Sequence, residues 1–226
     1  MISIENLSKS YGNKIVLENI NLKLKRGKVY GIVGENGAGK TTLFNCISGL
    51  EKYNGTINCE YKNIKESLGY LQTEPYYFSK ITGLEYLQLL CNAKNLEQID
   101  FIEKNIFDLP LNEYAIKYST GMKKKLALTA LLLQENKFFI LDEPFNGVDI
   151  HSNIIITEII QELKRLGKTI LISSHIFSTL NETCDEILFL KNKSIYIHVE
   201  KAEFGTLEME MKEYSIGNKI KKLNLK

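Results

Sequence analysis

The chain reads Gly34-Glu35-Asn36-Gly37-Ala38-Gly39-Lys40-Thr41 at residues 34–41, which matches the pattern G-x-x-x-x-G-K-[ST]. Glycines let backbone N–H groups approach phosphate oxygens without a Cβ in the way. Lys40 can reach the β and γ phosphates, and the Thr41 hydroxyl can bind Mg²⁺. The stretch therefore predicts a site for ATP or a similar nucleotide with Mg²⁺. We expect the phosphates to be held by Gly34, Asn36, Gly37, Ala38, Gly39, Lys40, Thr41 and Thr42.

The sequence on either side of this loop has the pattern that such a site requires. Residues 28–33 are a short apolar run typical of a buried strand, and residues 42–48 have the apolar spacing of a helix that ends before Gly49. A helix N-terminus that follows a strand and a glycine loop favours an anion. A glycine turn that binds nothing would not need a lysine and a threonine after its last glycine.

Composition narrows the class of protein. The 226 residues are 44% hydrophobic and 25% charged, which is ordinary for a globular domain. A net charge of +2 gives no electrostatic case for nucleic acid. The four cysteines form no C-x-x-C pair, so we expect core residues in a reducing compartment. No signal peptide is read at residues 1–5, and no apolar stretch approaches the ~20 residues that span a bilayer. We expect a cytoplasmic chain that meets a membrane only through a partner.

The remaining pattern predicts an α/β fold. Apolar runs at 138–141 and 169–173 flank a helical pattern at 156–166, which indicates parallel strands with a right-handed crossover. Within residues 2–24, strands are expected on either side of the polar turn at 11–14. Further strands are expected at 55–59 and at 186–190. Residues 81–130 read as helices, broken near Pro110. The chain after about Glu200 predicts a frayed helix or a partly disordered end.

Two carboxylates follow the strand at residues 138–141. In a doubly wound sheet, ligands bind at the carboxyl ends of the strands, so Asp142 and Glu143 should lie near the phosphates. Asp142 can hold Mg²⁺, and Glu143 can orient or deprotonate the attacking water. A polar turn before Pro144 would explain the pair alone, but not its combination with a phosphate loop about a hundred residues upstream.

A further motif carries a family resemblance. The stretch Tyr118-Ser119-Thr120-Gly121-Met122 is similar to the signature L-S-G-G-Q of the ATP-binding cassette (ABC) transporters, although only Ser119 and Gly121 match it. With the two nucleotide motifs, it makes residues 1 to about 200 resemble the nucleotide-binding subunit of such a transporter, in the drug and bacteriocin exporter branch. The resemblance implies that Ser119 and Gly121 cap the γ-phosphate bound to a second subunit.

The resemblance implies further roles. His175 matches the histidine that contacts the γ-phosphate, and Tyr11 matches the aromatic residue that stacks on adenine, although a surface tyrosine at a strand end would look the same. The glutamine expected before a Glu-Pro pair is displaced here, because Gln72 stands one residue early and Thr73 occupies its position. The predicted catalytic residues are thus Glu143, His175 and Lys40, and the predicted metal ligands are Thr41, Asp142 and Gln72.

The implied architecture is a P-loop NTPase with a mainly parallel RecA-like core sheet, an N-terminal antiparallel β subdomain and an inserted α-helical subdomain. We expect residues 1–75 and 136–200 to form the nucleotide-binding core, 76–135 the helical subdomain and 201–226 a tail. The implied partners are a polytopic membrane subunit in a separate chain and a second ATP-binding subunit, identical or different. The expected function is ATP hydrolysis that powers export of a drug, a peptide or a lantibiotic-like solute from the inner face of the membrane.

Other functions explain less of the sequence. Chromosome and repair ATPases separate the two nucleotide motifs by a long coiled coil, whereas only about a hundred residues separate Lys40 from Asp142 here. Related translation factors carry two cassettes in one chain, and this sequence has one. A P-loop kinase of small metabolites would lack the motif at Ser119 and the histidine at 175. The alternative that stays open is a P-loop ATPase that acts in regulation, or as a small-molecule kinase, without transport.

Overall fold

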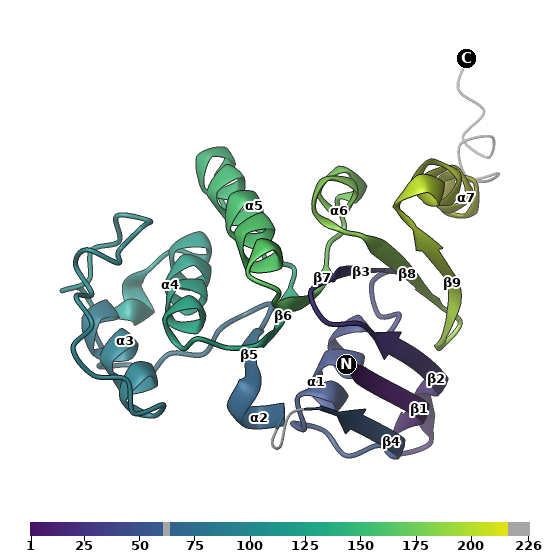
Figure 1. The fold of residues 1–226 in the computed structure, drawn as a ribbon, viewed down its shortest axis with the longest axis horizontal. Coiled ribbons are helices and arrows are strands. Elements are labelled where there is room, and N and C mark those ends of the chain that lie inside the picture. The colour runs from purple at the N-terminus through teal and green to yellow at the C-terminus, as the bar shows by residue number, and fades with distance from the viewer. Residues whose placement is uncertain (61–63, 217–226) are drawn as a thin grey trace.

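The computed structural model describes residues 1–60 and 64–216, with side chains to residue 211. Its centre is a six-stranded sheet in the order β5-β6-β7-β3-β8-β9 (Figure 1). All neighbouring strands are parallel except β8 and β9, which are antiparallel. The strands are β3 (Val29–Val33), β5 (Leu68–Leu71), β6 (Phe138–Asp142), β7 (Thr169–Ser173), β8 (Glu186–Lys191) and β9 (Ser194–Glu200).

A smaller antiparallel sheet forms the N-terminal part. It has the order β2-β1-β4, with β1 (Ile2–Tyr11), β2 (Lys14–Leu24) and β4 (Asn54–Cys59). The polar turn that joins β1 to β2 has Gly12 at φ 56°, a conformation that glycine adopts without strain. The predicted class, with a mainly parallel core sheet and an N-terminal antiparallel sheet, is confirmed.

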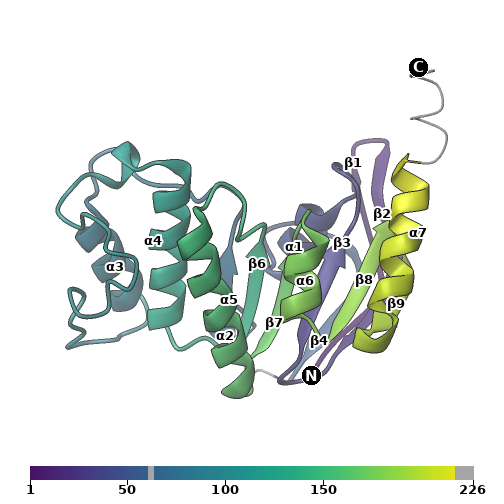
Figure 2. The same ribbon diagram turned by 90° about the horizontal axis from the view of Figure 1, so that it is seen from above.

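The large sheet is buried on both faces, because alternate side chains enter two different cores. On β3, Val29 and Val33 join one core, whereas Tyr30 and Ile32 join the other. Helices α5 (Ile150–Arg165), α6 (Phe177–Thr183) and α7 (Phe204–Ile216) lie along the first face (Figure 2). Helix α1 (Lys40–Ile47) lies between the second face and the small sheet.

The helical part projects beyond β5 and β6, at the left of Figure 1. It contains α3 (Gly83–Asn92) and α4 (Thr120–Leu133), with a 3-10 turn at Ala115–Lys117, while the short α2 (Ile64–Ser67) precedes β5. The expectation of helices throughout residues 81–130 is wrong for 93–114, which form turns and loops. Asn95, Gln98 and Asp108 have positive φ values that a helix does not accommodate.

The C-terminal part is more regular than the sequence suggested. Strand β9 was not predicted, and a 3-10 turn at Lys201–Glu203 leads from it into α7. The expected helix after Glu200 is present as α7, whose Phe204 and Leu207 are buried. The expectation of a disordered end falls on residues 217–226, which lie outside the described residues.

All four cysteines are free, and Cys46, Cys91 and Cys184 are buried. Across residues 1–60 and 64–216, no helix has the length and apolar character needed to cross a bilayer.

Candidate functional site

The phosphate-binding loop joins the end of β3 to the start of α1. Gly39 caps the helix at φ 108°, and a Cβ placed on Gly34 would lie only 2.6 Å from the carbonyl oxygen of Leu190. The Lys40 ammonium curls over the loop and donates to the carbonyl oxygen of Gly34 at 2.8 Å. Burial lowers the pKa of Lys40, while the nearby charges of Glu143 and Asp142 act in the opposite direction.

A hollow of about 240 Å³ lies above this loop. It brings together the N-terminus of α1 and the residues at the ends of β5, β6 and β7. The predicted phosphate loop therefore faces the predicted carboxylates and histidine. Its lining is Val16, Asn36, Gly37, Ala38, Gly39, Lys40, Thr41, Thr42, Thr73, Asp142, Glu143 and His175.

Asp142 is the centre of a hydroxyl network at the floor of this hollow. Its Oδ2 accepts hydrogen bonds from Thr41 Oγ1 at 2.6 Å and from Thr73 Oγ1 at 2.8 Å, and its Oδ1 accepts one from Ser173 Oγ at 2.6 Å. The same Ser173 oxygen accepts from the backbone N–H of Glu143 at 2.9 Å. The network fixes the carboxylate beside Thr41, in the first turn of α1.

These oxygens suit Mg²⁺. The ion takes hard oxygen ligands and is usually held by one or two carboxylates together with substrate phosphates, which is what Asp142 and Thr41 offer. It does not need a dense cluster of ligands, and the described residues contain no group of three histidine, cysteine or acidic side chains placed for a metal.

Glu143 faces His175 across the hollow. The His175 backbone N–H donates to Glu143 Oε2 at 3.2 Å, and His175 Nε2 lies 3.0 Å from Glu143 Oε1. Glu143 is only 6% exposed, and this burial raises the pKa of its carboxyl, opposed chiefly by the charges of His175 and Lys40. Oε1 is buried and accepts no well-aligned hydrogen bond within the part of the chain that the structure describes, and the imidazole of His175 is the polar group beside it.

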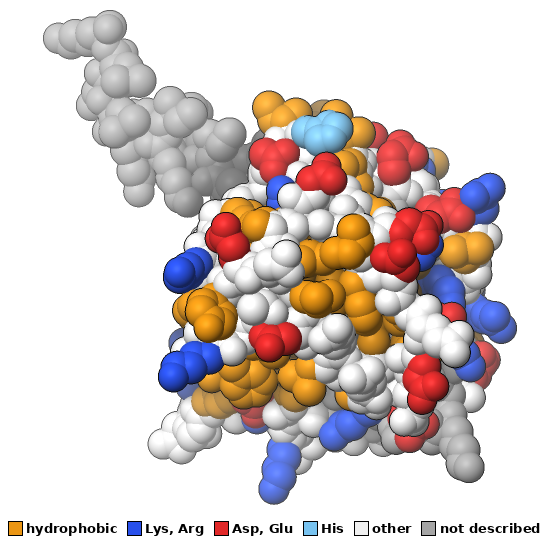
Figure 3. Space-filling view, turned by 90° about the vertical axis from the view of Figure 1, so that its left-hand side faces the viewer, with side chains coloured by type: hydrophobic (Ala, Val, Ile, Leu, Met, Phe, Trp, Pro, Cys, Tyr) orange, Lys and Arg blue, Asp and Glu red, His pale blue; other side chains and the backbone are white. Residues whose placement is uncertain are grey.

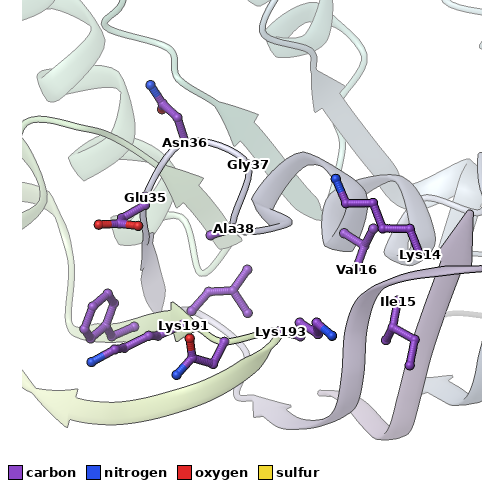
Figure 4. Close-up of a pocket in the computed structure, with 12 residues that line it drawn as sticks. Lys14, Ile15, Val16, Glu35, Asn36, Gly37, Ala38, Lys191 and Lys193 are labelled. Atoms are coloured by element: carbon purple, nitrogen blue, oxygen red, sulfur yellow. The ribbon is translucent and has the colours of Figure 1, made fainter.

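A second hollow of about 280 Å³ adjoins the first on the other side of the loop (Figure 4). The two share Val16, Asn36, Gly37 and Ala38, and the second is closed by Lys14 and by the turn between β8 and β9. Tyr11, which is 45% exposed, lines neither hollow, and its ring lies 4.6 Å from Lys9 Nζ. Stacking of adenine on Tyr11 therefore stays a prediction.

The structure separates Gln72 from Thr73. Thr73 lines the phosphate hollow and bonds to Asp142, whereas Gln72 lines a different hollow with Tyr76 and Leu131. Neighbouring residues of an extended segment point to opposite faces, so the displacement by one residue decides which side chain reaches the site. The geometry favours Thr73 over the predicted ligand Gln72.

Ser119 and Gly121 lie outside the phosphate hollow of their own chain. Ser119 caps α4 by accepting a hydrogen bond from the Met122 backbone N–H at 3.2 Å. A Cβ on Gly121 would lie 2.5 Å from the carbonyl oxygen of Gly147, so only glycine allows this contact. Ser119 and Thr120 are exposed at the start of α4, whereas Gly121 is buried, and the role of Ser119 and Gly121 at a second subunit's nucleotide stays a prediction.

Two residues around the site were not predicted to take part: Ser173 ends β7 beside Asp142, and Lys124 is buried beneath Glu143. Thr73, which follows β5, stands at the glutamine position in the sequence, and the sequence leaves the choice between it and Gln72 open. Ser173 could have been identified from its position at the end of a buried strand, because the carboxyl ends of neighbouring parallel strands meet at one edge of the sheet.

Comparison with known proteins agrees with this geometry. A family model described as "ABC transporter" matches residues 17–146. The bacitracin transport ATP-binding protein BcrA of Enterococcus faecalis is 33% identical over 234 residues, which cover 96% of this chain and 75% of that protein. The lantibiotic transport ATP-binding protein SrtF of Streptococcus pyogenes is 32% identical over 212 residues, covering 88% and 91%. A solved ATP-binding subunit of an ABC transporter superposes with a TM-score of 0.79 at 27% identity, covering 91% and 93%.

Proposed function

This chain belongs to the ABC transporter family as a subunit that binds and hydrolyses ATP, and we propose that it powers export through a separate membrane subunit. One observation supports the assigned roles above all others: Lys40, Thr41, Asp142, Glu143 and His175 line a single hollow. Relatives named for bacitracin and lantibiotic transport support a peptide-like or drug-like solute.

In the proposed mechanism, the phosphates of ATP lie against the backbone N–H groups of the loop and the N-terminus of α1. Lys40 releases the carbonyl oxygen of Gly34 and turns to the β and γ phosphates. Thr41 and Asp142 would hold Mg²⁺, which neutralises charge on the β and γ oxygens when bound.

Glu143, which lines the hollow, accepts the proton of the attacking water on its carboxylate. A raised pKa suits this role, because a base is most effective when its pKa lies near the working pH. His175 holds the carboxylate in place and stabilises charge on the γ-phosphate. Ser119 and Gly121 of a second subunit complete the site.

The helical region is the proposed contact with the membrane subunit, and it presents exposed apolar side chains (Figure 3). Tyr76 is 73% exposed and Phe78 56% exposed, and their rings meet edge to face at 5.6 Å. Exposed apolar clusters mark interaction sites more often than scattered residues do. Further exposed apolar residues of this region are Leu89, Ile102, Ile106, Tyr114 and Ile116.

Kinetics of two variants test the assignment. Glu143→Gln should keep its affinity for ATP within about 2-fold and lose on the order of 100-fold or more in kcat, because it removes the base and not the phosphate contacts. Lys40→Ala should instead weaken ATP binding. Full turnover by Glu143→Gln would refute the role of Glu143, and unchanged affinity in Lys40→Ala would refute the role of the loop.

The transport role has its own test. A tagged chain extracted with detergent from its native cells should co-purify with a polytopic membrane protein, and vesicles that contain both should move a peptide antibiotic only with the parent chain and not with Glu143→Gln. Purification without any membrane protein would favour a regulatory ATPase.

A further inference from the structure

Lys124 is a charged side chain in an unusual place. It lies on α4 and is only 1% exposed, although lysines are almost never fully buried unless paired. Its ammonium donates to two carbonyl oxygens, of Glu143 at 2.7 Å and of Asn146 at 2.9 Å. No carboxylate among residues 1–60 and 64–216 forms an ion pair with it. A buried cation held by backbone carbonyls alone is costly, so its contacts should serve a specific purpose.

The turn that Lys124 holds is itself strained. Glu143 has φ 52°, in the left-handed region, and it precedes Pro144, which restricts the backbone further. The Glu143 carbonyl oxygen also accepts from the Asn146 backbone N–H at 3.2 Å. Strained conformations of this kind persist only where the surroundings enforce them.

Both backbone polar groups of Glu143 are therefore fixed from different elements. Ser173 on β7 accepts from its N–H, and Lys124 on α4 donates to its carbonyl oxygen. With the two ends of the residue held, the side chain is directed at His175 and the hollow.

Lys124 also connects two parts of the molecule that act on different nucleotides in the proposed dimer. Helix α4 begins at Ser119 and Gly121, and Gly121 contacts the carbonyl of Gly147. One residue after Lys124, the Lys125 ammonium lies 3.2 Å from Asp149 Oδ2. Helix α4 is thus joined to residues 143–149 at three successive points.

We propose that Lys124 is a positioning residue that sets the direction of Glu143 through its backbone and carries movement of α4 to that carboxylate. The proposal rests on the role of Glu143 given above. When a second nucleotide draws the N-terminus of α4 toward it, the buried ammonium moves the Glu143–Asn146 turn with the helix. Hydrolysis at one nucleotide would then respond to occupancy of the other.

Steady-state kinetics of the full chain test this proposal. Lys124→Met keeps most of the apolar stem but removes the ammonium donor from both carbonyls, and only the Asn146 backbone N–H then holds the Glu143 carbonyl oxygen. The value of kcat should fall about 10- to 100-fold, since small misplacements of a reacting group have effects of this size. Affinity for a non-hydrolysable ATP analogue should stay within about 2-fold, because Lys124 lines neither hollow. Lys124→Gln, whose amide can donate to the carbonyls, should recover part of kcat.

Lys123→Met is the matched control. It removes a charge from the adjacent residue of the same helix, whose ammonium makes no hydrogen bond to residues 143–149 within the described structure, and it should keep the kcat of the parent. If Lys124→Met does not fold, Lys124→Gln decides the question by the same comparison of kcat with affinity. Parent-like kcat in the Lys124 variants, or a loss of affinity that equals the loss of kcat, would overturn the proposal.

Measuring Glu143→Gln in parallel separates the two claims. Parent-like turnover in Glu143→Gln would mean that the role of Glu143 is wrong, and the proposal for Lys124, which rests on that role, would then be wrong as well. Loss of turnover in Glu143→Gln together with full turnover in Lys124→Met means that only the role of Lys124 is wrong.

Discussion

At the scale of single residues, the surroundings of Glu143 suit the role of base that we propose for it. Glu143 is buried on a strained turn, and its pKa is raised because burial disfavours the charged form. A raised pKa in the folded state means that the protonated form contributes stability below the unfolded pKa, and that this contribution disappears as pH rises through the folded pKa. Glu143 therefore makes the nucleotide-free protein less stable at neutral pH.

The pH dependence of stability checks this reasoning. Glu143→Gln cannot ionise, so its melting temperature should exceed that of the parent by a margin that grows as pH rises from about 4 to about 8. Thermal unfolding without nucleotide measures the margin. A difference that is constant with pH, or that shrinks as pH rises, would show that the pKa of Glu143 is not raised.

The phosphate loop tolerates no side chain at Gly34. A methyl group there would meet the carbonyl oxygen of Leu190, which belongs to β8 and cannot rotate away. Gly34→Ala should displace the loop and weaken ATP binding at least about 10-fold, measured by calorimetry. Gly205→Ala is the control, since nothing lies within 4 Å of that position, and it should bind ATP as the parent does.

The residues that could be identified from the sequence each belong to a short contiguous motif. Lys40, Thr41, Asp142 and Glu143 stand in short patterns whose chemistry is local. Thr73 and Ser173 act only because β5, β6 and β7 are neighbours in the sheet, and the buried Lys124 depends on how α4 packs. None of these contacts is encoded in spacing along the chain.

Secondary-structure elements differ in how well their sequences specify them. The strands β6 and β7 are short apolar runs because both of their faces are buried, and they were predicted. Strand β9 alternates partly buried and exposed residues at the edge of the sheet, and its neighbouring lysines and glutamates concealed that pattern. Residues 93–114 have apolar residues at helical spacing in places, but their turns are set by local backbone conformation and by packing.

Helix α3 begins with a capping box, which gives a measurable contribution. The Thr82 hydroxyl accepts from the Glu85 backbone N–H at 3.2 Å, and the Glu85 carboxylate accepts from the Thr82 N–H at 2.8 Å. Thr82→Ala should lower the free energy of unfolding by about 1 kcal/mol, measured with urea. Thr82→Ser keeps the acceptor and should lie close to the parent. Equal losses in both variants would mean that the hydroxyl is not the stabilising group.

On the scale of the whole molecule, the proposed catalytic site and the proposed docking surface lie at different places. The phosphate hollow lies over β3 and β6, while Tyr76 and Phe78 belong to the exposed helical region. The double substitution Tyr76→Ser with Phe78→Ser should therefore reduce co-purification with the membrane subunit at least about 10-fold, because exposed aromatic residues are typical binding hot spots.

The control for this prediction is an aromatic residue elsewhere. Tyr196 on β9 is comparably exposed, and Tyr196→Ser should leave co-purification unchanged. ATP affinity of the isolated chain should be the same in all three proteins. Weakened ATP binding in the double variant would point to a disturbed fold and not to a docking surface.

The position of Ser119 and Gly121 has a consequence for the rate law. Neither residue lines the phosphate hollow of its own chain. If they complete the site of a second copy, as proposed, a single copy carries the phosphate loop but lacks part of the hydrolytic centre. The rate of phosphate release should then be second order in the concentration of the chain when the protein is dilute, and should become first order once pairing is saturated. A double-logarithmic plot of rate against protein concentration would show the change in slope, and a first-order dependence down to the lowest concentrations would mean that each copy works alone.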